Sequence, residues 1–346
     1  MAKILLTSDW HLTDKPRDAY RFKFLSWLGE FMEKEGVDAV CMLGDLTDSK
    51  DRHSGKFITQ VTSALCRLAA ICPLVILRGN HDCLDPAYPT FGFLDRLPNM
   101  YFVQGAQLLE FGVGREATQV FLTAHRRGDV DWADLIHQNG LLEQLIPPSL
   151  FLIHQTLAGA VASNGFKLEG IDPKSFGGKH PFQIFSGDIH VPQTLGRVTY
   201  VGSPYHIHFG DTFAPRLLLW TPRKITSVEW KEGPSRHVWT VTDPNNLRTM
   251  KSKKGDQVKV RLSLPRSLYA DWAQYQQAVE EECEQLGVEL IGVSLVPQEP
   301  GKGGSIEKKA SDLPSLSPKD IVTDFAKREN LDRPTTQIGK QLVVEG

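Results

Sequence analysis

Short groups of carboxylate, imidazole and amide side chains recur along this sequence, each after a run of apolar residues. The clearest group is Asn80, His81 and Asp82, which follows the run Leu74–Leu77 and the turn residue Gly79. Asn80 offers a neutral oxygen to a hard cation, His81 offers a proton near neutral pH, and the Asp82 carboxylate can fix the tautomer of the imidazole. These residue types predict a metal site with acid–base chemistry.

Four further apolar runs end in the same way. Lys3–Leu6 precedes Asp9 and His11, Ala39–Leu43 precedes Asp45 and Asp48, Phe151–Ile153 precedes His154, and Phe182–Phe185 precedes Asp188 and His190. An ordinary turn or cap explains any one group by itself. Because the carboxyl ends of strands meet at one edge of an open α/β sheet, five such groups predict a shared site.

Two divalent metal ions suit this set of side chains. Two cations roughly 3.5 to 4 Å apart can hold a bridging hydroxide and clamp both oxygens of an in-line displacement. A shared carboxylate such as Asp45 keeps the ions that close. Imidazole and carboxylate ligands without cysteine point to manganese (Mn²⁺), with magnesium (Mg²⁺), iron (Fe²⁺) and zinc (Zn²⁺) as alternatives.

The segments between the first groups carry helical patterns. Apolar residues at helical spacing predict helices over Tyr20–Glu35, which ends at Gly36, and over Ser54–Ala70. Strands that alternate with helices pair in parallel through right-handed crossovers. Later runs follow one another more closely, and they predict a second, mixed or antiparallel sheet: Tyr101–Val103, Gln119–Ala124, Thr199–Val201 and Leu217–Trp220. The predicted fold class is α/β, with two stacked mixed sheets flanked by helices.

The chain has 346 residues, more than a single core usually holds, so we expect more than one domain. Residues 1–222 form the predicted main domain. Period-2 alternation over Val258–Leu264, a helical pattern over Ser267–Leu286 and a strand at Val288–Val296 predict a small α/β domain over 223–297. Residues 298–317 have the composition of a flexible linker. A short helix beginning at Pro318 predicts a tail, 318–346, with one apolar face.

Composition sets further limits. A net charge of -2 gives no global basic field, so a nucleic-acid surface must be local or supplied by a partner. The five cysteines lack metal-ligand spacing and fit reduced thiols of a cytoplasmic protein. No apolar run approaches the length of a membrane span, so we expect no membrane association.

In chain order, the motifs DWH, GDLTD, GNHD, LIHQT and GDIH resemble those of the calcineurin-like metallophosphoesterases. The stretch YVGSP at Tyr200–Pro204 is similar to the nuclease branch, the SbcD-type DNA repair exonucleases that partner a coiled-coil, SMC-like ATPase. The resemblance covers about the first two thirds of the chain. It implies a binuclear metallophosphoesterase fold with a small capping domain that helps to admit DNA.

The resemblance implies a role for each motif residue. Asp9, His11 and His190 would bind the first metal ion, Asp45 would bridge both ions, and Asn80 with His154 would bind the second. His81 would not be a ligand but would protonate the leaving oxygen.

One position departs from that family. Asp188 stands where those enzymes usually carry the first histidine of a His-x-His pair. As a ligand, Asp188 would leave the site with one positive charge fewer, which favours hard cations. In the alternative, Asp188 lies outside the ligand shell and His206 or His208 replaces it.

Several residues outside the ligand set are candidates for substrate binding. Asp48 belongs to the same motif as Asp45, and His206 and His208 lie just past the YVGSP stretch. Arg126 follows a strand and can contact a phosphate, although the pattern favours a solvent-facing basic turn. Lys253 and Lys254 belong to a basic segment before the small domain's strand, where phosphate contacts compete with a solvated loop.

These features together predict a two-metal phosphodiesterase that acts on DNA. The resemblance implies exonuclease action on duplex ends and endonuclease action on single strands. The resemblance implies an ATPase partner bound by the tail and a homodimer, for which the apolar segment Tyr88–Leu97 is a candidate surface. The chain is compact for that family, which points to a phage recombination protein in the host cytoplasm. Two alternatives stay open: a nucleotide or small-molecule phosphodiesterase of the same superfamily, and a non-catalytic adaptor.

Overall fold

The computed structural model describes residues 2–112, 117–126, 149–176 and 182–297. The chain divides into two compact units, Met1–Gln298 and Glu299–Gly346. The predicted linker and tail (298–346) therefore lie outside the described residues.

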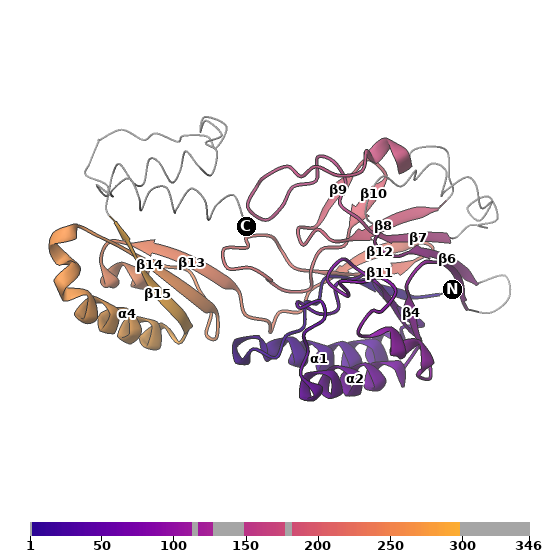
Figure 1. Cartoon of the computed structure of the whole chain (residues 1–346), viewed down its shortest axis with the longest axis horizontal. Coiled ribbons are helices and arrows are strands. Elements are labelled where there is room, and N and C mark those ends of the chain that lie inside the picture. The colour runs from indigo at the N-terminus through magenta and orange to yellow at the C-terminus, as the bar shows by residue number, and fades with distance from the viewer. Residues whose placement is uncertain (1, 113–116, 127–148, 177–181, 298–346) are drawn as a thin grey trace, which may run out of the picture. The chain divides into compact units, whose positions relative to one another are not determined.

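A six-stranded sheet carries three of the five ligand groups (Figure 1). Its strands, in the spatial order β12–β11–β1–β2–β3–β4, are β1 (Ile4–Thr7), β2 (Ala39–Met42), β3 (Leu74–Leu77), β4 (Met100–Val103), β11 (Leu217–Thr221) and β12 (Lys224–Val228). Strands β1 to β4 pair in parallel, whereas β11 pairs antiparallel with both β1 and β12. The parallel pairing of β1, β2 and β3 confirms the parallel arrangement that was predicted for these strands.

A second six-stranded sheet carries the other two groups. Its order is β5–β6–β7–β8–β10–β9, and its strands are β5 (Ala106–Phe111), β6 (Thr118–Thr123), β7 (Ser149–His154), β8 (Gln183–Gly187), β9 (Gln193–Leu195) and β10 (Val198–Tyr200). Strands β5 and β9 are the antiparallel members. The predicted pair of mixed sheets is therefore correct.

Two predicted strand assignments were wrong. Tyr101–Val103 and Leu217–Trp220 belong to β4 and β11 of the first sheet, not to the second. Strand β4 follows a short 3₁₀ turn, Gly92–Arg96, and pairs in parallel with β3. Strand β11 returns from far along the chain to pair with β1. Sequence spacing does not encode these long-range pairings.

Helices α1 (Tyr20–Glu35) and α2 (Gly55–Ala69) pack on the outer face of the first sheet. The Ser54 side chain caps α2 by accepting from the Phe57 amide, and Gly36 ends α1 with a left-handed φ of 62°. Strand β1 alternates its side chains: Leu5 packs in the cluster that includes α1 and α2, while Ile4 and Leu6 pack in the cluster shared with the second sheet. Strand β1 is thus buried on both faces.

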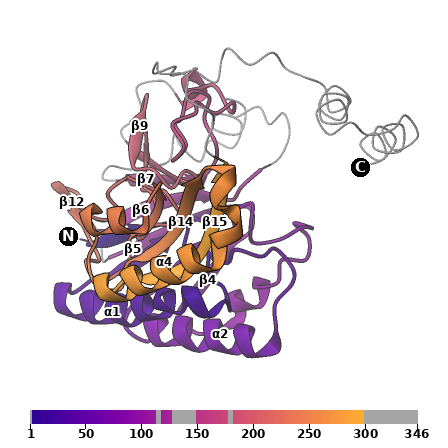
Figure 2. The same cartoon turned by 90° about the vertical axis from the view of Figure 1, so that its left-hand side faces the viewer.

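A three-stranded parallel sheet follows, built from β13 (Arg236–Val241), β14 (Gln257–Leu264) and β15 (Glu289–Pro297). Helix α4 (Trp272–Leu286) contributes to its apolar core and is prominent in Figure 2. Strand β13 was not predicted, and the first turn of the predicted helix is 3₁₀, at Arg266–Asp271. Strand β12 continues the first sheet to Val228, past the predicted boundary at residue 222, and the three-stranded sheet begins at Arg236. The division of residues 1–297 into two domains stays a prediction.

Two composition-based expectations can be compared with the described ranges. All five cysteines are unpaired, and only Cys66 is exposed. Within the same ranges, no helix combines the length and the apolar character that crossing a membrane requires.

Candidate metal centre

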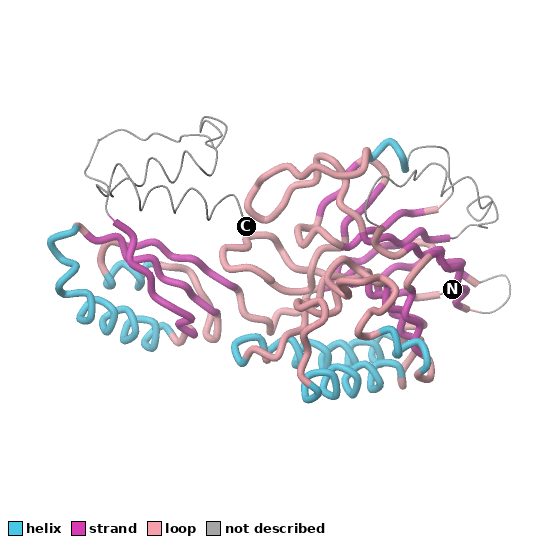
Figure 3. The backbone as a smooth tube through the Cα atoms, viewed as in Figure 1, coloured by secondary structure: helices cyan, strands magenta, loops and turns pink. Residues whose placement is uncertain are grey.

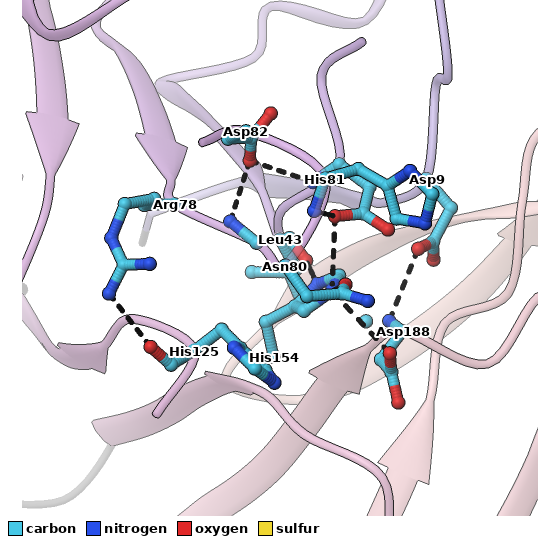
Figure 4. A network of polar contacts seen from close by, with 12 residues as sticks. Asp9, Leu43, Arg78, Asn80, His81, Asp82, His125, His154 and Asp188 are labelled. Atoms are coloured by element: carbon cyan, nitrogen blue, oxygen red, sulfur yellow. Dashed lines mark hydrogen bonds and ion pairs between the residues drawn. The ribbon is translucent and has the colours of Figure 1, made fainter. Parts of the chain in front are cut away.

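The five ligand groups converge at the carboxyl ends of β1, β2, β3, β7 and β8, where the loops of the two sheets gather (Figure 3). We call this cluster the cup and define it by the predicted metal ligands: Asp9, His11, Asp45, Asn80, His154, Asp188 and His190. Figure 4 shows several of its side chains together. Placement at strand ends explains how residues so distant in sequence meet.

One half of the cup surrounds Nε2 of His154. This nitrogen lies 3.0 Å from Oδ1 of Asn80, 3.4 Å from Oδ1 of Asp45 and 3.8 Å from Oδ1 of Asp188. The other ring nitrogen, Nδ1, lies 2.6 Å from the carbonyl oxygen of Leu43. Because a carbonyl only accepts, Nδ1 carries the proton and Nε2 keeps its lone pair in the neutral ring, which is the arrangement of a metal-binding histidine.

The other half of the cup surrounds Nε2 of His11. It lies 3.1 Å from Nε2 of His190 and 3.5 Å from Oδ2 of Asp45. Ligand atoms of Asp9, His11 and His190 lie within 4.8 Å of one another, as do those of Asp9, Asp45 and His154. The two oxygens of Asp45 therefore face the two halves of the cup, as a bridging ligand must.

Four cup residues have a left-handed backbone: Asp9 (φ 55°), His11 (φ 42°), Asp45 (φ 61°) and Asp188 (φ 82°). Few residues other than glycine adopt this conformation, and it concentrates at functional sites. A residue in this conformation turns the backbone away from the direction of the preceding strand. The four side chains consequently turn inward, and the surrounding structure bears the strain.

Two glycines allow the loops to approach this closely. A Cβ atom at Gly44 would collide with the His154 ring, and one at Gly79 would collide with the Asp45 carboxylate and its backbone nitrogen. Gly44 also has a φ of 91°. The glycines of the GD and GN motifs are therefore required by the packing around the ligands.

The donor set fits divalent cations. Oδ2 of Asp9 and Nδ1 of His11 are buried and have no hydrogen-bond partner among the described residues. The Oδ1 atom of Asn80 faces only acceptors, namely the Asp45 carboxylate and Nε2 of His154, and hydrogen bonding would require the amide to be reversed. Acceptors that converge on one another without donors are accommodated when a cation lies among them.

Burial is the largest influence on the pKa values of the cup side chains described next. Burial raises the pKa of Asp9 to about 8, an effect that His154 opposes and Asp45 and Asp188 strengthen. Burial, with the nearby Asp82, raises the pKa of Asp45 well above its usual range. Burial and then His190 lower the pKa of His11, and burial and then His208 lower that of His190 to about 3. The imidazoles of His11 and His190 are thus neutral, as metal ligands must be.

Asp82 does not orient His81, contrary to the prediction from sequence. Its carboxylate accepts from the backbone nitrogens of Gly79 (2.6 Å), Leu46 (2.9 Å) and Asp45 (3.0 Å). Nδ1 of His81 instead lies 2.9 Å from the carbonyl oxygen of Asp48. Asp82 thus joins the loops after β2 and β3, because these buried amides need an acceptor that the loops themselves do not supply.

Asp188 lies within the cup. Its Oδ2 accepts from the hydroxyl of Thr156, and its backbone nitrogen donates to Oδ1 of Asp9 at 3.2 Å. His206 points elsewhere, since its ring nitrogens contact the carbonyl oxygen of Phe213 and the amide of Arg236. His208 stacks near His190, with ring centroids 5.2 Å apart, on the other half of the cup. Asp188 is therefore the residue placed beside His154.

The remaining predicted residues have different positions. Asp48 lies at the rim, 3.7 Å from Nδ1 of His11 and 3.3 Å from the Lys15 ammonium. Arg126 lines a cavity next to Asn80. Lys253 donates to the carbonyls of Lys231 and Gly233, and Lys254 is an exposed residue whose chain lies near Gly287. Neither lysine contacts the cup in the part of the chain that the structure describes.

Sequence reasoning missed Arg21. This buried guanidinium donates to the carbonyl oxygen of His11 and lies 3.6 Å from the Asp18 carboxylate, which Arg236 of β13 also contacts. Arg21 lies on helix α1, at a position that the helix buries. A charged residue on the apolar face of a predicted helix was the signal in the sequence that could have indicated its role. It holds the loop that carries Asp9 and His11.

A family comparison agrees with this geometry. Residues 2–192 match the family model described as calcineurin-like phosphoesterase, and the chain belongs to that family. This family uses divalent metal ions, and the cup contains groups of side chains that could hold them.

The similar proteins include the SbcD component of the nuclease SbcCD from Escherichia coli (strain K12), 36% identical over 90 residues, which are 23% of this chain and 21% of that protein. The protein of the same name from Rhodobacter capsulatus is 26% identical over 258 residues, covering 59% of this chain and 62% of that protein. The chain thus spans less than two thirds of either relative. A dimetal phosphatase structure from Danio rerio aligns with a TM-score of 0.39 and 11% identity, covering 66% of this chain and 99% of that one.

Proposed function

We propose that this protein is a two-metal-dependent DNA nuclease, with exonuclease action on duplex ends and endonuclease action on single strands. The observation that carries the proposal is that the cup borders a groove lined by cations. Asp48 and His208 line the groove, and they also contact His11 and His190 of the cup. A phosphodiester held along the groove would thus meet the metal ligands.

The groove has a volume of about 340 Å³. Six cationic side chains line it: Lys15, Arg17, Arg21, Arg236, Lys259 and Arg261. Its two carboxylates, Asp18 and Asp48, leave a positive excess. Phe209 adds an aromatic face, with Nζ of Lys259 at 4.6 Å from the ring centre. Cations with an aromatic ring suit a phosphate backbone and an unstacked base, and they favour a polynucleotide over a small phosphoester.

The cup residues divide into two ligand sets in this proposal. Asp9, His11, Asp45 and His190 would hold one ion, and Asp45, Asn80, His154 and Asp188 the other. Bound divalent ions supply Lewis acidity and neutralise the charge of the phosphate; manganese is the candidate that the ligand chemistry favours. His81, held by the Asp48 carbonyl, would donate a proton to the leaving oxygen.

Both relatives are named as one part of SbcCD, which supports a multi-subunit assembly. We propose that the tail at 318–346, outside the described residues, binds a coiled-coil, SMC-like ATPase, and that the protein acts in DNA repair or recombination. A homodimer through Tyr88–Leu97 has support from side-chain exposure, since Tyr88 is 80% and Phe93 38% exposed. Truncation at Pro297 should abolish ATPase binding and leave metal-dependent cleavage intact.

Release of nucleotides from a linear duplex in Mn²⁺ tests the catalytic proposal. The wild-type protein should release nucleotides, and a His81→Ala variant should do so at least a hundredfold more slowly. A Lys259→Glu/Arg261→Glu variant should bind duplex more weakly and with a shallower salt dependence, whereas Lys224→Glu, an exposed lysine outside the groove, should bind normally. Cleavage of mononucleotide esters without any cleavage of DNA would instead favour a small-molecule phosphodiesterase, and binding of the ATPase without any hydrolysis would favour an adaptor.

A further inference from the structure

A second cavity, which we call the Arg78 pocket, borders the cup at Asn80. It has a volume of about 380 Å³ and is lined by Arg78, Asn80, Cys83, Pro86, Gln104, Gly105, Ala124, His125 and Arg126. In Figure 4, Arg78 and His125 lie to the left of Asn80, and Asp9 and Asp188 lie to its right. The basic groove borders the cup through Asp48 and His208 instead, so the pocket and the groove adjoin different cup residues.

Arg78 is a buried cation that has no counter-ion among the described residues. Its side chain is 6% exposed, and its guanidinium donates to the carbonyls of His125 (2.7 Å) and Gln104 (3.4 Å) and to Sγ of Cys83 (3.6 Å). Nε has no hydrogen-bond partner, and no carboxylate in the described residues forms an ion pair with this arginine. A buried charge surrounded only by neutral groups is costly, so its retention favours an anionic ligand.

Three other arginines of the same unit differ from Arg78 in their partners, their burial or their position. Arg21 and Arg236 both contact the Asp18 carboxylate. Arg216 also donates only to carbonyls, those of Val201 and Tyr200, but it is only half-buried and does not line the Arg78 pocket. Arg78 therefore combines three features: burial, missing counter-charge and a position in a cavity that touches a predicted metal ligand.

The chemistry of the pocket indicates which anion it takes. Arg78 lies in its wall and Arg126, half-buried, provides a second positive charge. Cys83, Pro86 and Ala124 supply apolar surface, and Gln104 and His125 supply polar atoms. Planar guanidinium groups bind phosphate in a bidentate manner, and the volume lies in the range of small-molecule sites, about 300–1,000 Å³. A phosphate with an attached nucleoside matches this combination.

We infer that the Arg78 pocket is a subsite for the nucleotide next to the scissile phosphodiester, whose own phosphate pairs with Arg78 and Arg126. This inference rests on the proposed nuclease function and deepens it. The scissile phosphate lies in the cup, one flank of the strand lies in the basic groove, and the neighbouring nucleotide occupies the pocket. Arg78 is then a substrate-binding residue. It directly precedes the GNHD motif and lies two positions before Asn80 in the sequence.

A substrate series tests the inference. Hydrolysis of a dinucleoside monophosphate, d(NpN), is compared with that of its 5′-phosphorylated and 3′-phosphorylated forms, in Mn²⁺. The wild-type protein should cleave one of the two phosphorylated forms with a kcat/KM at least tenfold above that of d(NpN). Arg78→Met and Arg126→Met should each reduce that ratio, Arg78→Met to below threefold. Arg216→Met, the matched control, should keep both the ratio and the basal rate.

The ratio is internal to each variant, so a general loss of activity does not change it. If neither terminal phosphate raises kcat/KM in the wild-type protein, or if both variants keep the gain, the inference is wrong. Should Arg78→Met fail to fold, Arg126→Met on the pocket's half-buried wall decides between the outcomes.

A binding measurement separates this inference from the nuclease proposal. Deoxyadenosine monophosphate, as the 5′ and the 3′ isomer, is titrated into the metal-free protein, with deoxyadenosine as the uncharged control. Arg78→Met should weaken binding of one isomer about tenfold without changing that of deoxyadenosine. If the wild-type protein cleaves neither linear duplex DNA nor any dinucleotide, the nuclease proposal fails, and this titration alone decides the pocket: an unchanged Kd in Arg78→Met overturns the inference.

Discussion

Nδ1 of His81 lies 2.9 Å from the carbonyl oxygen of Asp48. Because the carbonyl only accepts, this contact keeps one proton on Nδ1, so the doubly protonated ring would donate its second proton from Nε2 to the substrate. The His81 ring also meets the His11 ring edge-on, with centroids 5.0 Å apart. The proposed proton donor is thus oriented by the backbone of one cup loop and placed against a predicted metal ligand, His11, from another.

From this position we predict that His81→Ala lowers kcat about 10²- to 10⁴-fold for a DNA substrate, because an alkoxide leaving group needs a proton. The loss should be much smaller for bis(p-nitrophenyl) phosphate, whose leaving group departs as a stable anion. Steady-state kinetics with both substrates measures the difference. Calorimetry should show unchanged metal stoichiometry, and His237→Ala, a histidine that pairs with Asp256, serves as the control. Equal losses on both substrates would contradict a role in proton donation.

Asp82 should act mainly on stability. In Asp82→Ala, three buried backbone N–H groups lose their acceptor, and each unsatisfied group costs about 1–3 kcal/mol, so we expect a loss of roughly 3 kcal/mol or more. Urea denaturation of the metal-free protein measures this. Asp51→Ala, which removes an acceptor for the exposed amide of Leu84, should cost no more than about 0.5 kcal/mol. Full stability with a His81-like loss of kcat would instead restore Asp82 as the residue that orients His81.

Asp188 should determine which ions the cup prefers. Asp188→His replaces a carboxylate beside His154 with an imidazole, so affinity should shift from Mn²⁺ and Mg²⁺ toward Zn²⁺. Competition titrations with pairs of metal ions measure the shift. Thr156→Val removes the hydroxyl that donates a hydrogen bond to Asp188 and leaves the carboxylate in place. It should therefore change the affinity for every ion by the same factor and leave the preference between ions unchanged. An unchanged preference in Asp188→His would place Asp188 outside the ligand shell.

Asp18 should make stability depend on pH. Burial alone would raise the pKa of Asp18, but Arg21, Arg236 and the Thr13 hydroxyl outweigh it and hold the pKa below its usual range. A lowered folded-state pKa stabilises the protein above the unfolded-state value of about 3.9, and this contribution is lost as pH falls through the folded-state value. Asp18→Asn should therefore cost about 3–5 kcal/mol at pH 7, because two buried arginines lose their counter-charge.

Chemical denaturation at pH 7 and in stepwise more acidic buffers measures this prediction. The stability difference between wild-type protein and Asp18→Asn should narrow as the buffer becomes more acidic than the unfolded-state pKa. Asp14→Asn, at a neighbouring exposed carboxylate, should show neither the loss nor the pH dependence. A gap that stays constant across the series would mean that the Asp18 charge does not stabilise the fold.

Local patterns were sufficient for the elements that hold the ligands. Helix α1 has the predicted bounds, because its apolar spacing and the glycine that ends it are encoded within the segment itself. Residues 101–103 and 217–220, by contrast, were assigned to the wrong sheet. Their neighbours are chosen by pairing across the fold, and a β-rich run is equally compatible with either sheet.

The sequence by itself determined which residue types follow the strands, and therefore that oxygen and imidazole donors would gather at the carboxyl ends of strands. Only the tertiary structure decided which contacts these side chains make: that the Asp48 carbonyl orients His81, that Asp82 joins two loops, and that Arg78 is buried with no counter-charge from the residues the structure describes. The physical reason is the distance along the chain over which each interaction acts. Strand and helix propensities act between near neighbours, whereas a hydrogen-bond partner or a missing counter-ion depends on which distant loop packs alongside.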